Sequence, residues 1–409
     1  MSEAIVIVGG GHAGVQLCSA LAAAGLGAQT TLVCAEPVLP YQRPPLSKAF
    51  LKQQDDALQA HRSAGWFAEQ GITVHLGDAA VAIDRAAQQL QLASGARLPY
   101  GQLVLATGAR ARALPPLHPG LANVHVLRNA SDATRLRATL PAMQRLTVLG
   151  GGFIGLEVAA TAAALGKAVQ VLEAAPRLMQ RSVSPVLSAH VQDGHRAAGI
   201  DLRLGATVAG IELQGDRLVA LQVNGERQAI DTLLLGVGAE PETTLAAAAG
   251  LACDNGIVVD TMLRTSDPHI LAVGDCCNFP LPGSGPVPTR LRLESVQNAN
   301  DQAKWALATL TGAPPPAAPV PWFWSEQGAI RLQMAGLAPA GADLHRRPGA
   351  TPASFSVLHY ACGRLACVES VNAPMDHLAA RRLLELGLSP DPAAACDSAR
   401  PLKSFIPLA

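Results

Sequence analysis

Two glycine-rich segments of the sequence have a spacing that suits the binding of a dinucleotide. In the first, Gly9, Gly11 and Gly14 form a G-x-G-x-x-G pattern, and the acidic residue Glu36 follows further along the chain. The glycines of such a pattern permit a tight turn and a close approach of the backbone to a pyrophosphate, while the later carboxylate hydrogen-bonds a ribose. The alternative is a glycine-rich turn with Glu36 as a solvated loop acid.

The second segment repeats this pattern with Gly150, Gly152 and Gly155, and Glu173 follows it. A carboxylate at that point accepts hydrogen bonds from an adenosine ribose and would repel a 2′-phosphate, which favours NADH over NADPH. Arg177 could soften this preference, or it could be an ordinary solvated residue at the start of a helix. Two dinucleotide sites indicate a flavin and a nicotinamide, because hydride transfer requires a donor and an acceptor face to face.

Each glycine pattern lies between a predicted strand and a predicted helix. Residues 4–8 are apolar and β-branched, as in a strand buried in a parallel sheet, residues 15–24 predict an Ala-rich helix, and residues 30–34 predict a second strand. The same order returns with a predicted strand at residues 146–149, a helix at 156–165 and a strand at 168–172. Asn224-Gly225 predicts a hairpin in the stretch that follows. The chain is therefore predicted to be α/β, with two Rossmann-like dinucleotide-binding domains.

A proline-rich segment, residues 314–321, predicts a stiff linker to a third, C-terminal domain that begins near Val320. The length of 409 residues fits two or three domains. Lys and Arg total 31, as do Asp and Glu, so no overall field attracts nucleic acid or an anionic membrane. The sequence has no membrane-spanning apolar run and no signal peptide at its start, which predicts a cytoplasmic protein.

Residues 39–48, Leu-Pro-Tyr-Gln-Arg-Pro-Pro-Leu-Ser-Lys, resemble a segment of the NADH-dependent ferredoxin reductases. These enzymes serve bacterial haem monooxygenases and ring-hydroxylating dioxygenases and belong to the glutathione-reductase-like flavoproteins. The resemblance extends along the chain through residues 106–110, 150–157, 265–275, 293–299 and 321–325. It implies an α+β C-terminal domain and the following division: residues 1–113 and 241–319 bind FAD, residues 114–240 bind NAD, and residues 320–409 form the C-terminal domain.

The resemblance implies a set of residues that hold FAD. Ala13 would lie beside the pyrophosphate, Glu36 at the adenosine ribose and Asp275 at the ribityl chain. Val296 belongs to the first turn of a predicted helix whose free backbone N–H groups would face the flavin. The remaining contacts would be made at the adenine end or at the phosphates by Arg43, Val81 and Arg128.

Lys48 and Glu157 are the residues to which the resemblance assigns catalysis. Lys48 would lie near the hydride-accepting nitrogen of the flavin and pair with Glu157. A cation there would stabilise added electron density, and the carboxylate would offset the cost of burying an ammonium group. The alternative is that both are exposed residues on helix surfaces. Trp324 would pack near the flavin, whereas Trp322 is expected to be a core aromatic at the start of a strand.

The positions of the cysteines argue against flavin-dependent disulfide reduction. Residues 36–60 contain no cysteine, so the thiol that disulfide reductases need beside the flavin is missing. The adjacent Cys276 and Cys277 are expected to be packing residues, and Cys362 and Cys367 to be structural residues of a strand pair. The eight cysteines show no C-x-x-C pair and no metal-ligand spacing.

The resulting hypothesis is an enzyme that transfers a hydride from NADH to FAD and then single electrons to a 2Fe-2S ferredoxin that feeds an oxygenase. An NADH oxidase, a rubredoxin reductase and a redox-responsive flavoprotein that acts by partner binding are the alternatives. The enzyme is expected to be a monomer or a weak dimer. A neutral chain needs a local cationic face for an acidic ferredoxin. The candidate docking patch is Arg290, Arg292, Arg381 and Arg382, which could instead be ordinary solvated arginines.

Overall fold

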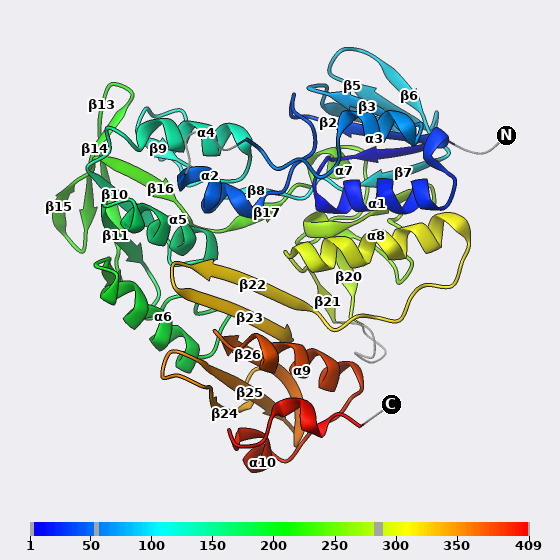
Figure 1. Cartoon of the computed structure of the whole chain (residues 1–409). Helices are drawn as coiled ribbons and strands as arrows, with labels where there is room; N and C mark the ends of the chain where they lie inside the picture. The colour runs from blue at the N-terminus through cyan, green and yellow to red at the C-terminus, as the bar shows by residue number, and fades with distance from the viewer. Residues whose placement is uncertain (1–3, 53–56, 282–288, 408–409) are drawn as a thin grey trace. The chain divides into compact units, whose positions relative to one another are not determined.

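The computed structural model describes residues 4–52, 57–281 and 289–407, and the contacts divide the chain into two compact units (Figure 1). The first unit consists of Met1–Arg43, Leu58–Arg110 and Ala239–Pro319. The second unit consists of Pro44–Ala57, Ala111–Gly238 and Val320–Ala409. The short segment Pro44–Ala57 therefore packs with the second unit, although the residues on both sides of it belong to the first.

The first unit is built on a five-stranded parallel sheet in the order β19-β7-β1-β2-β3. Its central strand β1 is buried on both faces, since its four apolar side chains are all buried. The helices α1 and α8 pack against each other in this unit. The bounds are β1 (Ile5–Val8), β2 (Thr30–Cys34), β3 (Thr73–Leu76), β7 (Gln102–Leu105), β19 (Ile270–Ala272), α1 (His12–Ala23) and α8 (Val296–Thr311).

Smaller elements complete the first unit. An antiparallel sheet has the order β4-β5-β6, another sheet the order β18-β20-β21, and β17 pairs with β8. The strands are β4 (Ala80–Asp84), β5 (Gln89–Leu92), β6 (Arg97–Pro99), β8 (Ala109–Ala111), β17 (Ala239–Pro241), β18 (Ile257–Val258), β20 (Cys277–Pro280) and β21 (Arg290–Leu291). The short helices are η1 (Gly27–Gln29), α3 (Ala64–Glu69), α7 (Thr244–Ala248) and η3 (Gly274–Cys276).

The second unit repeats the parallel sheet, in the order β12-β11-β10-β16-β9. The sheet strands are β9 (Val124–His125), β10 (Arg145–Leu149), β11 (Ala168–Glu173), β12 (Asp201–Leu204) and β16 (Thr232–Leu235), and the antiparallel strands are β13 (Val208–Gln214), β14 (Arg217–Val223) and β15 (Glu226–Ala229). Helices of this unit are η2 (Pro44–Ser47), α2 (Ala49–Lys52), α4 (Ala130–Thr139), α5 (Phe153–Ala164) and α6 (Pro185–Ala197). The predicted hairpin at Asn224-Gly225 is confirmed, because both residues have positive φ between β14 and β15.

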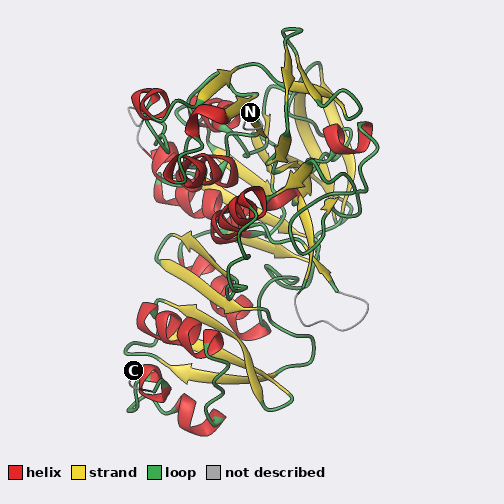
Figure 2. Cartoon of the chain, turned by 90° about the vertical axis from the view of Figure 1, so that its right-hand side faces the viewer, coloured by secondary structure: helices red, strands yellow, loops and turns green. Residues whose placement is uncertain are grey.

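The C-terminal part of the second unit is an antiparallel sheet in the order β22-β23-β26-β25-β24, with helix α9 packed on β23 and β26 (Figure 2). The α/β fold class with an α+β C-terminal part is confirmed. The bounds are β22 (Trp322–Gln327), β23 (Ile330–Gly336), β24 (Asp343–Pro348), β25 (Phe355–Ala361), β26 (Arg364–Val371), α9 (Pro374–Glu385), α10 (Pro392–Cys396) and η4 (Leu402–Phe405).

The two helices that follow the glycine patterns begin earlier than the sequence predicted. Helix α1 begins at His12 rather than at residue 15, and α5 begins at Phe153 rather than at residue 156. The third glycine of each pattern is therefore inside the helix. A Cβ at Gly14 would overlap the carbonyl oxygen of Gly9, so the missing side chain lets the first helical turn pack on the preceding loop.

Candidate active site

The first glycine pattern forms a turn whose open side faces the start of α1. Gly9 has φ +117°, and a Cβ there would overlap the carbonyl oxygen of Ala106, so this position tolerates only glycine. A Cβ at Gly11, by contrast, would meet no described atom within 4 Å beyond its own neighbours. Gly11 is the N-cap of α1 and has no side-chain cap. The free backbone N–H groups and the open space fit a pyrophosphate.

The acid of the first unit, Glu36, is held by two side chains. Its Oε2 accepts a hydrogen bond from the Tyr41 hydroxyl at 2.6 Å, and its Oε1 accepts one from Nη2 of Arg43 at 2.9 Å. Both charged side chains of this ion pair are about 30% exposed. The structure therefore brings together two of the residues predicted to hold the adenosine end of FAD.

Other predicted FAD residues of the first unit lie around the start of α1. Ala13 is buried, and a Cβ at Gly274 would lie 3.2 Å from the Ala13 side chain, so the turn that contains Asp275 packs against the glycine pattern. The Gly274 N–H donates to Oε1 of Gln302 at 2.7 Å, which fixes this turn to α8. Val296 is the first residue of α8, as the sequence predicted.

Val81 and Arg128 lie on other elements of the structure. Val81 is 51% exposed on β4. Arg128 belongs to the second unit, where its backbone N–H donates to Oδ2 of Asp132 at 3.0 Å just before α4. Their roles in FAD binding stay predictions.

The second glycine pattern has the same design as the first. Gly150 has φ +107°, and a Cβ there would overlap the carbonyl oxygen of Gly236. A Cβ at Gly155 would lie 2.8 Å from the carbonyl oxygen of Gly150, which explains the close packing of α5. A Cβ at Gly152 would have one described atom within 4 Å beyond its own neighbours, the carbonyl oxygen of Gly236 at 3.8 Å. This open helix N-terminus also fits a pyrophosphate.

The acid of the second unit, Glu173, is held by the backbone. Its Oε2 accepts from the N–H of Gly151 at 2.5 Å, and its Oε1 accepts from the N–H of Ala175 at 2.7 Å. Arg177 donates to the carbonyl oxygens of Val183 and Gln180, both at 2.8 Å. Arg177 therefore closes the loop after β11, and the expectation of a solvated arginine is wrong.

Lys48 and Glu157 form an ion pair within the second unit. Nζ of Lys48 lies 2.5 Å from Oε2 of Glu157, and the side chains are 20% and 5% exposed. The alternative that both are exposed surface residues is therefore wrong. The Ser47 hydroxyl donates to the same Oε2 at 2.6 Å. An ammonium group and a carboxylate are thus held at one buried point on α5.

The segment with Lys48 is tied to the second unit on both sides of the lysine. The Thr161 hydroxyl on α5 donates to the carbonyl oxygen of Ser47 at 2.9 Å. The guanidinium of Arg137 on α4 lies 4.0 Å from the ring centroid of Phe50, a cation–π contact. These contacts explain why residues 44–52 pack with α4 and α5.

Sequence reasoning missed further polar partners of Glu157. Its Oε1 accepts from the Ser325 hydroxyl at 2.7 Å, and Nε2 of Gln327 donates to Ser325 at 3.3 Å. Oε1 of Gln327 in turn lies 2.9 Å from Nε2 of His195. Burial lowers the pKa of His195, so this histidine is neutral near pH 7. Ser325 is the last residue of segment 321–325, which resembles the ferredoxin reductases, but no local sequence pattern predicts its contact with Glu157.

The aromatic pair of β22 lies on the opposite side of the strand from Ser325, because side chains alternate along a strand. The ring centroids of Trp322 and Trp324 are 5.5 Å apart. Trp322 also contacts the imidazole ring of His377. The guanidinium of Arg381 lies 4.7 Å from the Trp322 ring centroid, a cation–π contact. This agrees with a packing role for Trp322, while the flavin contact of Trp324 stays a prediction.

The cysteines are all described and all are free thiols. Burial raises the pKa of the Cys276 and Cys277 thiols, and it raises the pKa of Cys34 to about 12. Cys362 is exposed in the turn between β25 and β26, whereas Cys367 is buried within β26. Thiols that stay protonated are poor nucleophiles, in agreement with the predicted packing roles of the buried cysteines.

The first pair of the predicted docking patch, Arg290 and Arg292, is held by contacts within the first unit. Nη2 of Arg290 donates to the carbonyl oxygens of Val259 and Asn278, at 2.5 and 2.6 Å. Arg292 is only 12% exposed and is paired with Glu294. These contacts limit how far both side chains can reach, and the part of this pair in docking stays a prediction.

The second pair is also engaged, within the second unit. Arg381 stacks on the ring of Trp322, and Arg382 pairs with Glu385 at 3.4 Å one helical turn away. Only the latter arginine is exposed. The docking patch therefore stays a prediction, and its four arginines all have contacts within their own units.

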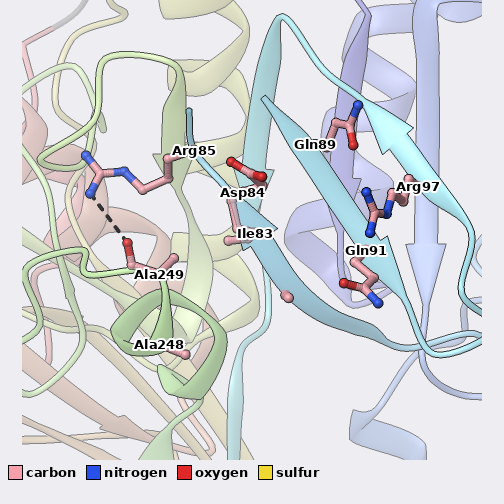
Figure 3. Close-up of a pocket in the computed structure, with 9 residues that line it drawn as sticks. Ile83, Asp84, Arg85, Gln89, Gln91, Arg97, Ala248 and Ala249 are labelled. Carbon is pink, nitrogen blue, oxygen red and sulfur yellow. Dashed lines mark hydrogen bonds between the residues drawn. The ribbon is translucent and has the colours of Figure 1, made fainter. Parts of the chain in front are cut away.

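A cavity of about 430 Å³ lies elsewhere in the first unit, between the β4-β5-β6 sheet and α7 (Figure 3). Its polar lining includes Gln89, Gln91 and Arg97. Arg85, which Figure 3 shows donating to the carbonyl oxygen of Ala249, is neutralised by Asp267 at 2.7 Å. None of the predicted site residues lines this cavity, so it is separate from both glycine patterns.

Comparison with known proteins assigns the fold to a family. The family model described as pyridine nucleotide-disulphide oxidoreductase matches residues 3–303, and a model described as reductase C-terminal matches residues 322–406. The chain belongs to the pyridine nucleotide-disulphide oxidoreductase family. Members of this family use FAD and NAD(H), which fits the two glycine cradles. The predictions of a flavoprotein oxidoreductase and of its two cofactors are thereby confirmed.

Individual relatives in this family match the whole chain. Rhodocoxin reductase of Rhodococcus erythropolis is 44% identical over 398 residues, which cover 96% of this chain and 92% of the relative. A ferredoxin reductase from Rhodopseudomonas palustris has a solved structure with a TM-score of 0.91 and 42% identity, covering 98% of this chain and 99% of that one. The covalent complex of putidaredoxin reductase with putidaredoxin gives a TM-score of 0.92 and 38% identity, covering 99% and 98%. The resemblance inferred from the sequence is confirmed.

No helix in the described ranges, 4–52, 57–281 and 289–407, is long and apolar enough to cross a membrane.

Proposed function

We propose that this chain is an NADH-dependent ferredoxin reductase of an oxygenase system. It would take a hydride from NADH and pass single electrons to a 2Fe-2S ferredoxin, which feeds a haem monooxygenase or a ring-hydroxylating dioxygenase. FAD, when bound, accepts two electrons as a hydride and can release them one at a time. The observation that carries the proposal is the partly buried Lys48–Glu157 pair, whose lysine lies in the segment where disulfide reductases need cysteine.

The two cofactors would divide between the two glycine patterns. Residues 1–113 and 241–319 would bind FAD, and residues 114–240 would bind NADH. The side chains of Arg43 and Glu36 support the first assignment, since they can hold the polar groups of an adenosine. The C-terminal domain would be residues 320–409.

NADH would be preferred to NADPH because Glu173 is fixed as a hydrogen-bond acceptor for a ribose. A 2′-phosphate in that place would meet the carboxylate, and two backbone N–H groups hold that carboxylate in place. The guanidinium that could have attracted the phosphate, that of Arg177, donates to two carbonyl oxygens instead.

Lys48 would act on the flavin through its charge. An ammonium group stabilises electron density that a neighbouring ring gains on reduction. Glu157 supports the ammonium in a poorly solvated place. The exclusion of water around this pair strengthens the interaction, because the local dielectric constant is low.

The proposed partner is supported by a relative of known structure. The related reductase in the solved complex is joined to putidaredoxin, and this chain would dock a ferredoxin of the same kind. It would work in the cytoplasm as a monomer or a weak dimer.

A panel of electron acceptors tests the proposal. The purified FAD protein should reduce at least one 2Fe-2S ferredoxin with NADH much faster than it reduces rubredoxin or oxygen. Faster turnover with rubredoxin would favour a rubredoxin reductase, and faster turnover with oxygen an NADH oxidase. An enzyme that NADH reduces but that passes electrons to none of these acceptors would instead favour a redox-responsive binding protein.

A further inference from the structure

The Glu157 carboxylate accepts hydrogen bonds on both oxygens, from two distant parts of the sequence. Oε2 accepts from Lys48 at 2.5 Å and from Ser47 at 2.6 Å. Oε1 accepts from the Ser325 hydroxyl at 2.7 Å and lies 3.4 Å from the backbone nitrogen of Glu326. One oxygen therefore serves the lysine segment, and the other is held by β22.

Ser325 has no contact with solvent and lies on the face of β22 that packs on α5. Its exposed fraction is 0%, and that of Glu157 is 4%. On the same face, two residues along the strand, Gln327 donates to the Ser325 oxygen at 3.3 Å. A serine hydroxyl has one proton, so a hydroxyl that accepts from Gln327 keeps that proton for the carboxylate.

The chain of hydrogen bonds ends at a neutral group. Gln327 contacts His195 through its Oε1, which requires the protonated nitrogen of the imidazole to be Nε2. Burial lowers the pKa of this histidine, whose Nδ1 has no hydrogen-bond partner among the described residues. The network thus contains one negative charge, that of Glu157, and one positive charge, that of Lys48.

We propose that Ser325 is a positioning residue for the Lys48–Glu157 pair, and that Gln327 fixes the direction of the Ser325 hydroxyl. The inference rests on the role proposed above for Lys48. Without the Ser325 hydroxyl, Oε1 of Glu157 loses its side-chain donor in a buried place, and the carboxylate is free to turn. The ammonium of Lys48 would then move with the carboxylate it is paired with.

This assignment gives the C-terminal region a part in the chemistry. Ser325 and Gln327 lie within residues 322–406, which match the reductase C-terminal model, whereas Glu157 lies in the oxidoreductase model. The three residues all belong to the second unit. The Lys48–Glu157 pair is therefore supported by a strand that is outside both proposed dinucleotide-binding segments.

The test is Ser325→Ala in the full-length FAD protein. The rate constant for flavin reduction at saturating NADH should fall roughly fivefold, as expected for the loss of one buried hydrogen bond. The flavin midpoint potential should become more negative, while FAD content and the KM for NADH stay near wild type. Ser325→Thr, which keeps a hydroxyl, should recover most of the rate and of the potential.

A double-mutant cycle separates positioning from a general effect on the fold. In the Lys48→Met background, Ser325→Ala should change the rate and the potential little, because the group that Ser325 positions is already gone. Equal losses in both backgrounds would overturn the proposal. The control is Ser370→Ala, which removes a buried hydroxyl from β26 whose partner is Ser356, and which should leave the rate unchanged.

Three further outcomes are decisive. If Ser325→Ala does not fold, Ser325→Cys keeps the size but donates weakly, and a wild-type rate and potential in that variant would overturn the proposal. If Lys48→Met alone has no effect, the proposed role of Lys48 fails. If Lys48→Met slows reduction but Ser325→Ala changes neither rate nor potential, the inference about Ser325 fails by itself.

Discussion

The two units build the same glycine turn, yet they hold the acid that follows it in different ways. In the first unit, Glu36 is bound by the side chains of Tyr41, which is buried, and Arg43, which is partly exposed. In the second unit, Glu173 is bound by two backbone N–H groups, from Gly151 and Ala175. A backbone donor cannot move away without a change in the loop, whereas a side chain can adopt another rotamer.

This difference suits a resident cofactor in one unit and an exchanging coenzyme in the other. An acid that is held in place before the ligand arrives loses little conformational entropy when the ligand binds. This matters for a coenzyme that binds and leaves in every catalytic cycle. For a cofactor that stays bound, the free-energy cost of rearranging two side chains arises only once. The same sheet order in both units shows that the fold itself does not make this distinction.

The largest expected effect comes from adding a methyl group at the open glycine of one G-x-G-x-x-G pattern at a time. Gly11→Ala should weaken FAD binding roughly a hundredfold, or about 2.7 kcal/mol, because a methyl group occupies the place of a phosphate. Gly152→Ala should leave the protein yellow but weaken NADH binding by a similar factor. Backbone φ is negative at both positions, so the fold should tolerate alanine. FAD content and NADH titration measure the two effects, and loss of FAD in Gly152→Ala would contradict the division between the units.

Lys48→Met asks whether a residue of the second unit serves the flavin that the first unit would hold. Flavin reduction by NADH should slow roughly thirtyfold, because a preorganised charge is lost where electron density develops. FAD content should stay normal, since the methionine side chain has a similar length. Anaerobic stopped-flow measurements at saturating NADH give the rate, and wild-type kinetics together with a wild-type midpoint potential would remove Lys48 from the mechanism.

Glu173→Ala and Glu36→Ala compare the two acids directly. Glu173→Ala should lower the NADH over NADPH ratio of kcat/KM roughly tenfold, since a charge-assisted hydrogen bond to the ribose and the repulsion of a 2′-phosphate are both lost. Glu36→Ala should lower FAD retention and leave that ratio unchanged. A changed coenzyme ratio in Glu36→Ala would show that the assignment of the two cradles is reversed.

The smallest expected effect concerns one buried histidine in each unit. Burial lowers the pKa of His61 and of His125 to about 4 in the folded protein. An unfolded histidine has a pKa of about 6.5, so the unfolded chain takes up protons first as the pH falls. Stability that is present above pH 6.5 should therefore be lost between about pH 6.5 and pH 4. His125→Leu should reduce the fall in Tm between pH 7 and pH 5, and an unchanged fall would contradict the neutral state of His125.

Local patterns determined much of the fold from the sequence alone. The two glycine turns, the hairpin at Asn224-Gly225 and the start of α8 at Val296 were all predicted and are all present. Each depends on the backbone preferences of a few neighbouring residues, on hydrophobic periodicity or on a helix cap, which any short segment expresses by itself. The chemistry of the two sites followed because a G-x-G-x-x-G pattern with an acid further along the chain occurs twice.

Only the tertiary structure decided which residues meet across the sequence. It placed Lys48 in the second unit, bonded Ser325 to Glu157, turned Arg177 to its own loop and paired Arg292 with Glu294. Ser325 and Glu157 are far apart along the chain, and no periodicity connects a hydroxyl on one strand to a carboxylate on a distant helix. Their contact exists because β22 packs on α5, and that packing is a property of the whole second unit. The sequence thus determined where the cofactors can bind. The fold decided which charged side chains are bound to other residues and which charged pair, Lys48 and Glu157, is held together.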